Sequence, residues 1–479
     1  MSTILSESLG AWWPEVILST GALLVVLFGA WTKRSQPVLA VSWFTLLASA
    51  VALWHAPLPP DTNLFFGMIV CDSFSLVFRW FALASIALVL LMVAGSREVE
   101  DAVRGEYLGL LLFVGLGLML MAESAHLLMA YVSMELVSLS SYLLVGLLRD
   151  ARSAEASLKY LLFGALASGV MLFGMSWLFG LTGALDFQTI QLSSAGMSGM
   201  MTHALLVAIV LLLVGVAFKI SMVPFHMWTP DAYEGAPMPV TALLSVGPKA
   251  AGLALLLRLM EALSPVWASV EPLVIVLAIS TMTLGNLVAI SQTNIKRLLA
   301  YSTIGQVGYL LIGFVVHTRQ GIEALLVYLI AYLLMNLGAF ACAVAVVNDT
   351  GRESLDAFKG LAHRAPILAL LCALFLLSLA GIPPLLGFLG KFLLFGAAIA
   401  SGHLWLAMAG VINSAIALYY YVNIIRQMYL LPSDRIKPFR VSLPIQLATS
   451  FCGVSTILLG LFPNALLLLI RAGSAVRLL

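Results

Sequence analysis

Apolar runs of about 20 residues recur along the whole chain, and only short polar linkers separate them. A helix of that length crosses the hydrocarbon core of a membrane, so each run predicts one transmembrane helix. The runs lie at 14–32, 37–55, 73–95, 106–122, 125–148, 158–181, 203–223, 241–262, 272–291, 300–317, 322–347, 365–400, 404–430 and 443–466. The pattern predicts an all-α polytopic membrane protein with about 14 transmembrane helices.

The seventh and twelfth runs predict helices that break inside the membrane. The twelfth is about 35 residues long, and one helix of that length would overshoot a hydrocarbon core of about 30 Å. Pro383 and Pro384 in its middle donate no backbone hydrogen bonds and crowd the carbonyl groups of Leu379 and Ala380. Pro224 interrupts the end of the seventh run in the same way. Broken backbone at this depth is tolerated only inside protein or beside a wet cavity.

Spans four to eight resemble spans nine to thirteen, which predicts an internal repeat. Three pairs of positions support it: Tyr142 and Tyr309 at an offset of 167, Glu155 and Glu323 at 168, and Pro224 and Pro383 at 159. Five spans is an odd number, so the second copy runs through the membrane in the opposite direction, as in many transporters. The predicted segments are three N-terminal helices (1–105), the first repeat (106–262), the inverted second repeat (272–430) and a C-terminal helix (443–479).

Positive charges are distributed unevenly among the linkers. Loops after odd-numbered spans hold fourteen Lys and Arg residues, whereas loops after even-numbered spans, with the C-terminal tail, hold four. Cytoplasmic loops are enriched in positive charge, so the odd-numbered loops are predicted to face the cytoplasm and both termini the other side.

Four ionisable side chains lie deep inside the apolar runs: Glu135, Lys219, Lys249 and Lys391. Each costs roughly 2.5–3.5 kcal/mol near the middle of a membrane helix unless it pairs, hydrates or loses its charge. Such groups usually mark a path for ions or protons. A Glu135–Lys219 pair would hold a proton when closed and release it when open; the plainer alternative is a static lock between two helices. For Lys391 the plainer alternative is snorkelling to the interface.

Lys159 and His226 are weaker candidates. Lys159, at the start of the sixth run, either joins the pathway or anchors the helix on the cytoplasmic side. His226, just past the break in the seventh run, could relay protons, although a lone loop histidine more often caps or hydrogen-bonds. The other charges are interpreted structurally: Lys296 and Arg297 as inner anchors, Asp231 and Glu234 as a solvated turn, and Arg79 and Arg426 as snorkelling or paired.

The composition and the motifs that are missing limit the kinds of chemistry that this chain could carry out. The chain is 62% hydrophobic and 10% charged, whereas a soluble protein carries about 25% charge. Its four cysteines are scattered without a CxxC pair, and it has neither a nucleotide-binding glycine motif nor a metal-ligand cluster. No cofactor is therefore predicted in this chain, and proton exchange is the chemistry that its residues support.

Four segments carry a resemblance that covers nearly the whole chain: "WWPEVILSTGALLVVLFG", "AFKISMVPFHMWTPDAYEGAPMPVTALL", "NIKRLLAYSTIGQVGYLLIG" and "GLAHRAPILALLCALFLLSLAGIPPLLGFLGKF". They resemble the subunit N family of bacterial NADH–quinone oxidoreductase, respiratory complex I. The resemblance implies an antiporter-like subunit of the membrane arm in the bacterial inner membrane, with periplasmic termini. NAD, flavin, iron–sulfur clusters and quinone would belong to partner subunits, and the chain would contact other complex I subunits and lipids.

The resemblance also implies roles for the buried charges. Glu135 and Lys219 match the ion pair of a first half-channel, Lys249 a central lysine, and Lys391 the lysine of the broken twelfth span. Lys159 matches a buried charged position between them. Two alternatives stay open: a subunit of a multi-subunit sodium–proton antiporter, and a purely structural subunit whose charges are static locks.

Overall fold

The computed structural model describes residues 8–32, 34–56, 62–433 and 437–474. Lys33, Arg435 and Arg477, which contribute to the charge count of the linkers, lie outside the described residues.

Thirteen helices in the described residues are long and apolar enough to cross a membrane. They are α2 (Trp13–Thr32), α3 (Ser35–His55), α4 (Ser73–Gly95), α5 (Arg104–Glu123), α6 (Leu127–Val145), α7 (Ala151–Thr182), α9 (Met200–Ile220), α11 (Met238–Ala262), α12 (Trp267–Ala289), α13 (Ile295–Val316), α14 (Arg319–Thr350), α18 (Leu404–Tyr429) and α19 (Leu443–Leu461). A further span is split into α16 (Pro366–Ala380) and α17 (Leu386–Ala400). The prediction of about 14 spans is confirmed.

Short elements connect the spans. They are α8 (Phe187–Ala195), α10 (Trp228–Gly235), α15 (Leu361–Arg364), α20 (Asn464–Gly473), and the 3-10 turns η1 (Phe65–Gly67), η2 (Asp101–Val103), η3 (Gly146–Leu148), η4 (Ser264–Val266) and η5 (Leu355–Phe358). Strands β1 (Thr62–Leu64) and β2 (Ile69–Cys71) pair antiparallel between α3 and α4. The purely helical expectation missed this hairpin, because its apolar strands of three residues are too short to show an alternating pattern.

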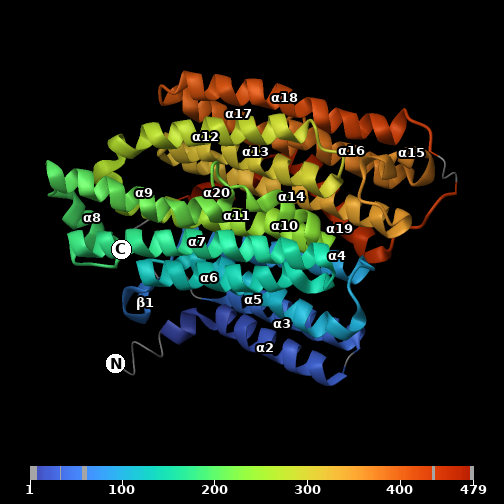
Figure 1. Cartoon of the computed structure of the whole chain (residues 1–479), viewed down its shortest axis with the longest axis horizontal. Helices are drawn as coiled ribbons and strands as arrows, with labels where there is room; N and C mark the ends of the chain where they lie inside the picture. The colour runs from blue at the N-terminus through green and yellow to red at the C-terminus, as the bar shows by residue number, and fades with distance from the viewer. Residues whose placement is uncertain (1–7, 33, 57–61, 434–436, 475–479) are drawn as a thin grey trace.

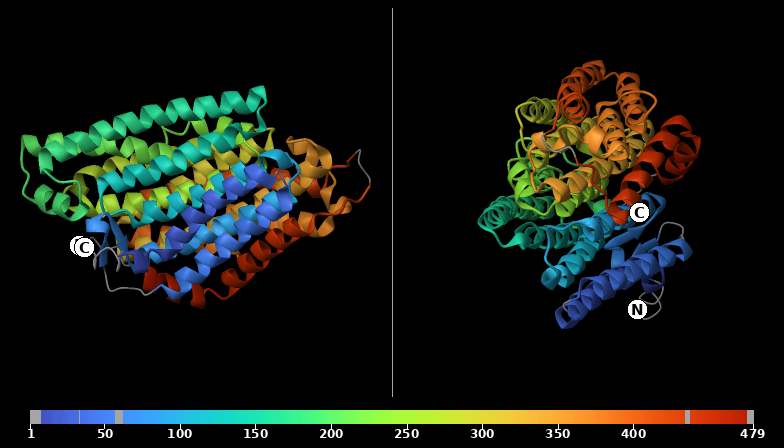
Figure 2. Two further views of the ribbon diagram at one scale, coloured as in Figure 1. Left: turned by 90° about the horizontal axis from the view of Figure 1, so that it is seen from below. Right: turned by 90° about the vertical axis from the view of Figure 1, so that its right-hand side faces the viewer.

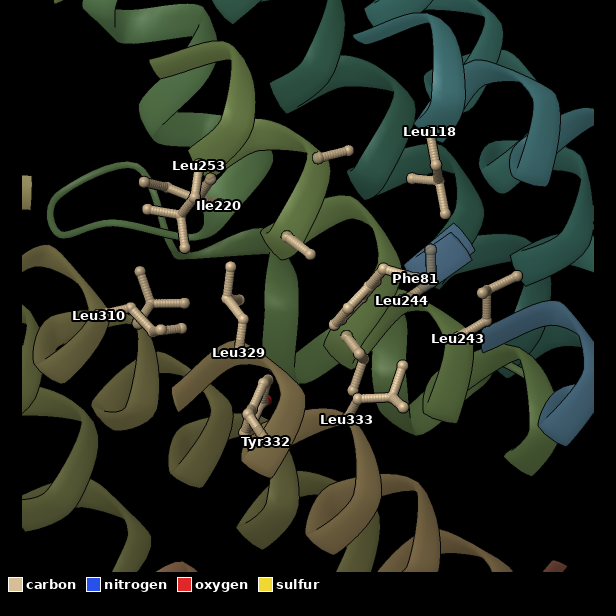
Figure 3. Close-up of a cluster of buried hydrophobic side chains, with 14 of the residues drawn as sticks. Phe81, Leu118, Ile220, Leu243, Leu244, Leu253, Leu310, Leu329, Tyr332 and Leu333 are labelled. Atoms are coloured by element: carbon tan, nitrogen blue, oxygen red, sulfur yellow. The ribbon is translucent and has the colours of Figure 1, made fainter. Parts of the chain in front are cut away.

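The helices lie side by side, and from α2 to α18 their order across the bundle largely follows the sequence (Figures 1 and 2). The C-terminal helices α19 and α20 return to pack against α4 and α14. The early helices α2 and α3 form one edge, and α17 and α18 form the opposite edge. Helix α11 lies in the interior, where Leu243, Leu244 and Leu253 face side chains of α4, α5, α13 and α14 (Figure 3). Lipid tails are as apolar as leucine, so close packing and polar contacts hold such a bundle together.

Paired backbone contacts confirm the internal repeat. Helices α7 and α14 both have 32 residues, and their ends are separated by 168 positions. The hydrogen bonds from Leu127 N to Leu185 O and from Ile295 N to Glu353 O are both 2.8 Å long and share this offset. The Glu155–Glu323 offset of 168 is therefore correct, whereas the offset of 167 between the two tyrosines is wrong by one residue. Helix α6 is the fifth span and α13 the tenth, so the copies run in opposite directions.

The two predicted breaks are present and have the same backbone form. Helices α9 and α16 end at left-handed residues, Ser221 (φ 62°) and Gly381 (φ 93°). The next N–H in each case reaches back to a carbonyl group five residues earlier, at 2.8 Å from Met222 and 3.0 Å from Ile382. This register has an offset of 160, so Pro224 corresponds to Pro384 and not to Pro383.

Candidate functional site

Lys249 lies near the middle of α11, and its side chain is completely buried. Its ammonium nitrogen has no hydrogen-bond partner among the described residues. The nitrogen lies 4.6 Å from the ring centre of Trp228 and 5.4 Å from that of Tyr233, which places its charge in cation–π contact with two aromatic rings. Pro248 precedes it inside the helix, where proline donates no backbone hydrogen bond. The structure thus places a lysine without a counter-ion at the centre of the bundle.

Lys219 is the second buried lysine and lies in the last turn of α9, next to the first break. Its Nζ donates a hydrogen bond of 3.0 Å to the hydroxyl oxygen of Ser138 on α6. Trp228 links this lysine to Lys249, because its indole N–H donates to the carbonyl oxygen of Phe218, 3.0 Å away, while its ring faces Lys249. One tryptophan therefore contacts the side chain of Lys249 and the backbone next to Lys219.

Glu135 lies one turn from Ser138 on α6, so both side chains share one helix face. Its carboxylate accepts a hydrogen bond from Ser168 on α7. The sequence pointed to the neighbouring serines of α6 as partners, but Ser138 and Ser141 bond to carbonyl groups of their own helix. Serines on a helix commonly do this, which left Glu135 dependent on the adjacent helix.

The predicted ion pair between Glu135 and Lys219 is not formed in this conformation. Among the described residues, Lys219 has no carboxylate oxygen within 4.0 Å, and Ser138 accepts its hydrogen bond instead. Ser138, which accepts this bond, is one helical turn from Glu135 along α6. This is the separated arrangement of a pair, in which a hydroxyl group holds the lysine.

Lys391 lies on α17, just after the second break, and is buried. Its Nζ donates to the carbonyl oxygens of Leu379 and Ala380 at 3.0 and 3.1 Å. These are the two carbonyl groups that the prolines of the break were expected to leave without a helical partner. The ammonium also lies 4.3 Å from the ring centre of Tyr309. The broken helix thus provides the ligands of its own lysine, and snorkelling is excluded.

Polar side chains that the sequence did not single out lie near both Lys249 and Lys391. The hydroxyl of Tyr332 donates to the carbonyl oxygen of Ser245, one turn before Lys249, and approaches Thr303 Oγ1 at the same distance of 3.0 Å. One turn further along α13, the amide nitrogen of Gln306 donates to Leu379 O at 3.3 Å, the oxygen that also accepts from Lys391. These uncharged residues carried no signal against an apolar background.

Lys159 and His226 are less closely tied to this row. Lys159 is the ninth residue of α7, and its side chain is 44% exposed in this chain, so its expected burial is wrong. It pairs with Glu155 at 2.8 Å and with Asp231 at 3.0 Å, which favours the anchoring interpretation. The ring of His226 is buried beside the first break, but its Nδ1 has no partner among the described residues. The structure therefore shows no relay through His226.

Charged residues of several loops meet at one end of the bundle. Lys296, expected to be an inner anchor, is only 1% exposed and lies 2.6 Å from Glu353. Asp231 and Glu234, expected in a solvated turn, belong to α10 and both pair with Arg297, at 2.8 and 2.7 Å. An adjacent cavity of about 870 Å³ is lined by Arg97, Glu98, Arg152, Glu234, Thr293, Asn294, Val347, Asn348, Gly351, Arg352, Glu353 and Ser354. The loops after odd-numbered spans share this end.

The pKa values of two acids in this cluster reflect their partners. Burial acts to raise the pKa of Glu353, but Lys296 and Arg152 together hold it below its ordinary value. Burial likewise opposes ionisation of Asp231, and Arg297 with Lys159 lowers its pKa overall. Both carboxylates are therefore fixed as anions by neighbouring cations.

Comparison with known proteins agrees with this geometry. Residues 124–417 match the family model described as NADH:quinone oxidoreductase/Mrp antiporter, TM. The chain is similar to NADH-quinone oxidoreductase subunit N 2 of Sorangium cellulosum, with 43% identity over 95% of both chains. It is also similar to subunit N of Anaeromyxobacter sp., with 43% identity over 87% of this chain and 86% of the relative.

Two solved structures have the same fold. A chain of respiratory complex I from Thermus thermophilus has a TM-score of 0.82 and 33% identity, and the match covers 96% of this chain and 100% of that one. A chain of the Mrp complex from Dietzia sp. has a TM-score of 0.84 at 24% identity, covering 98% and 97%, and shows the fold alone. From its identity to curated relatives over nearly its full length, this chain belongs to the subunit N family of NADH-quinone oxidoreductases.

Proposed function

We propose that this chain is a proton-translocating, non-redox subunit in the membrane arm of an NADH–quinone oxidoreductase. The buried, unpaired Lys249 between two further buried lysines is the observation that carries the proposal. A charged group at this depth is costly, and proteins retain such groups for transport. The row offers sites for a mobile proton, and the described residues contain no group of three or more His, Cys, Asp or Glu side chains that could hold a metal ion.

The proposed path begins at the cytoplasmic face. Protons enter through the first repeat by way of Glu135 and Lys219, pass Lys249, and reach Lys391 in the second repeat, which releases them on the other side. The Ser138 bond of Lys219 and the side chains of Tyr332 and Gln306 supply hydrogen-bonding groups along this row. Lys159 and His226 remain candidate members of the path.

In this proposal the redox chemistry takes place in partner subunits. These would hold NAD, flavin, iron–sulfur clusters and quinone, while this chain carries no redox centre and receives their signal through the membrane arm. The chain would span the bacterial inner membrane with its odd-numbered loops in the cytoplasm and both termini in the periplasm. Residues 1–105, 106–262, 272–430 and 443–479 would be its four functional segments.

The test uses the assembled complex in membrane vesicles. A native gel stained for NADH dehydrogenase activity first establishes that the tagged chain migrates with the enzyme. NADH-driven proton uptake is then measured for Lys219→Ala and for a control, Lys359→Ala, which changes a lysine at the surface. We expect the first variant to lose most pumping while assembly is retained, and the control to pump normally. Wild-type pumping by Lys219→Ala would refute the role of this lysine.

Two other results would replace the proposal. If lysine substitutions in the row abolish assembly and leave no enzyme to measure, the charges are structural locks. If the isolated chain migrates as a small inactive species and transports protons only in exchange for sodium, it is an antiporter subunit.

A further inference from the structure

Three charged side chains outside the lysine row are buried together among the first helices. They are Glu15 on α2, Arg79 on α4 and Glu123 on α5, and their side chains are 0%, 4% and 0% exposed. The sequence analysis expected Arg79 to snorkel or to pair, and the structure shows that it pairs. Neither glutamate was recognised from the sequence, because each lies at the edge of an apolar run.

The two carboxylates approach the same guanidinium group. Glu15 takes its fork, with Nε and Nη2 of Arg79 donating at 2.7 and 2.6 Å. Oε1 of Glu123 lies 2.8 Å from the same Nε, but it receives no hydrogen bond there. The other oxygen of Glu123 accepts a hydrogen bond of 3.3 Å from the indole of Trp12. Both carboxylates thus lie beside Arg79 Nε, and this nitrogen donates its hydrogen bond to Glu15.

The charges of this cluster do not balance when both acids are ionised. Among the described residues, Arg79 is the sole cation within 4.0 Å of either carboxylate. Three further titratable or charged groups face the cluster. Arg258 of α11 forms an ion pair of 2.8 Å with Asp72, and the Cys71 thiol lies 3.8 Å from Arg79 Nη1. Two carboxylates at one buried site with one cation cannot both remain charged at low cost.

The helix ends decide which acid is neutral. Glu15 lies in the first turn of α2, where the helix dipole favours a negative charge. Glu123 is the last residue of α5, where the dipole disfavours one. Glu15 also has the bidentate bond to Arg79, the stronger form of carboxylate recognition. All three differences favour an ionised Glu15 and a protonated Glu123.

We propose that Glu15, Arg79 and Glu123 form a proton-binding site in which Glu123 holds the proton and Glu15 the charge. Oε1 of Glu123 has no hydrogen-bond partner among the described residues. When it carries a proton, it can donate a hydrogen bond to the carboxylate of Glu15. The site lies at the end of the bundle where α2 begins and α5 ends. It also touches the central helix, because Arg258 of α11 donates a 2.6 Å hydrogen bond to the carbonyl oxygen of Ala122, next to Glu123. The site is separate from the lysine row and does not depend on the proposed function.

Infrared spectroscopy of the assembled complex tests this site, because a protonated carboxyl group has a C=O stretching band that ionised carboxylates lack. We expect Glu123→Gln to lose, at neutral pH, a band worth one carboxyl group, identified by its shift in D2O. Glu15→Gln should lose the same band although Glu123 is still present. Without Glu15, Arg79 pairs with Glu123, which then gives up its proton and becomes a carboxylate. Asp72→Asn is the matched control, a buried acid with its own cation, and should retain the band.

Identical C=O regions in wild-type and Glu123→Gln complexes would overturn the proposal and leave a static ion cluster. Retention of the band in Glu15→Gln would overturn the assignment of the charge to Glu15. If the Glu123→Gln complex does not assemble, Glu123→Asp provides the measurement: a protonated site requires its band to move, and an unchanged spectrum would refute the proposal.

Discussion

Lys249 and Lys296 lie on neighbouring central helices and are almost equally buried, yet their surroundings differ completely. Lys296 approaches the Glu353 carboxylate at 2.6 Å and donates to the carbonyl oxygen of Ala236 at 2.7 Å. The ammonium group of Lys249 faces the rings of Trp228 and Tyr233 and has no hydrogen-bond partner among the described residues. The comparison teaches that burial alone does not identify a lysine that moves protons. Lys296 has a counter-ion and a hydrogen-bond acceptor, whereas Lys249 has neither among the described residues.

The largest expected effect separates these two lysines by stability. Lys296→Met leaves the carboxylate of Glu353 without its closest cation, which typically costs about 3–5 kcal/mol when a buried pair is broken. Lys249→Met breaks no hydrogen bond and should leave stability unchanged while pumping is lost. The amount of assembled complex and its thermal unfolding temperature measure the first effect, and NADH-driven proton uptake measures the second. Equal destabilisation by both substitutions would contradict the comparison.

The loss of stability caused by Lys391→Met should be smaller than that of Lys296→Met and larger than that of Lys249→Met. The substitution removes the donor to two buried carbonyl groups, and each unsatisfied group costs about 1–3 kcal/mol. Lys219→Met leaves no backbone group without a hydrogen bond, because the partner of Lys219 is the Ser138 hydroxyl, which keeps its own bond to Met134 O. We therefore expect a lower unfolding temperature for Lys391→Met than for Lys219→Met in the same complex, with pumping impaired in both. The reverse order of stability would show that Lys391 does not secure the broken helix.

Ser138→Ala should have a smaller, functional effect. The hydroxyl accepts the bond from Lys219, and hydrogen bonds to charged groups are worth about 1.5–3 kcal/mol. Without it Lys219 is freer to approach Glu135, and we expect proton pumping to fall severalfold with assembly retained. Ser141→Ala is the matched control, since the Ser141 hydroxyl donates to Val137 O of its own helix and accepts no bond from Lys219. Equal pumping in the two variants would exclude a role for the Ser138 bond.

The smallest effect concerns pH at the loop end. Because Lys296 and Arg152 hold the pKa of Glu353 below its ordinary value, this acid contributes stability above its unfolded-state pKa. That contribution is lost as the pH falls through the pKa of the folded state. Unfolding temperatures measured on acidification should therefore fall less steeply for Glu353→Gln than for wild type. A parallel pH dependence would show that the cluster does not fix this carboxylate.

The sequence predicted the features that have a strong signal in an apolar chain. The number of spans, both helix breaks, the inverted repeat and the four deep charges all follow from long hydrophobic runs and from prolines or charges inside them. The link between Lys391 and the carbonyl groups of Leu379 and Ala380 was also within reach, since the prolines identify those carbonyl groups in advance.

The errors have a common physical origin. The Glu135–Lys219 pair, inferred from charge as one that opens and closes, has the open arrangement here, with Lys219 bonded to Ser138 on the same helix face as Glu135. Burial of Lys296 and exposure of Lys159 depend on which loops meet, and that is a tertiary property. Two of the three offsets read from single similar residues, 167 and 159, were wrong by one, because only backbone contacts define the alignment of two helices.

The inverted repeat has a consequence for the direction of transport. A path made of two oppositely oriented copies has much the same form when approached from either side of the membrane, and its two breaks share one backbone geometry. Such a path can therefore carry protons in either direction. The direction of net flow must then come from the difference in free energy applied across it, and a sufficiently large opposing proton gradient should drive the same residues backward.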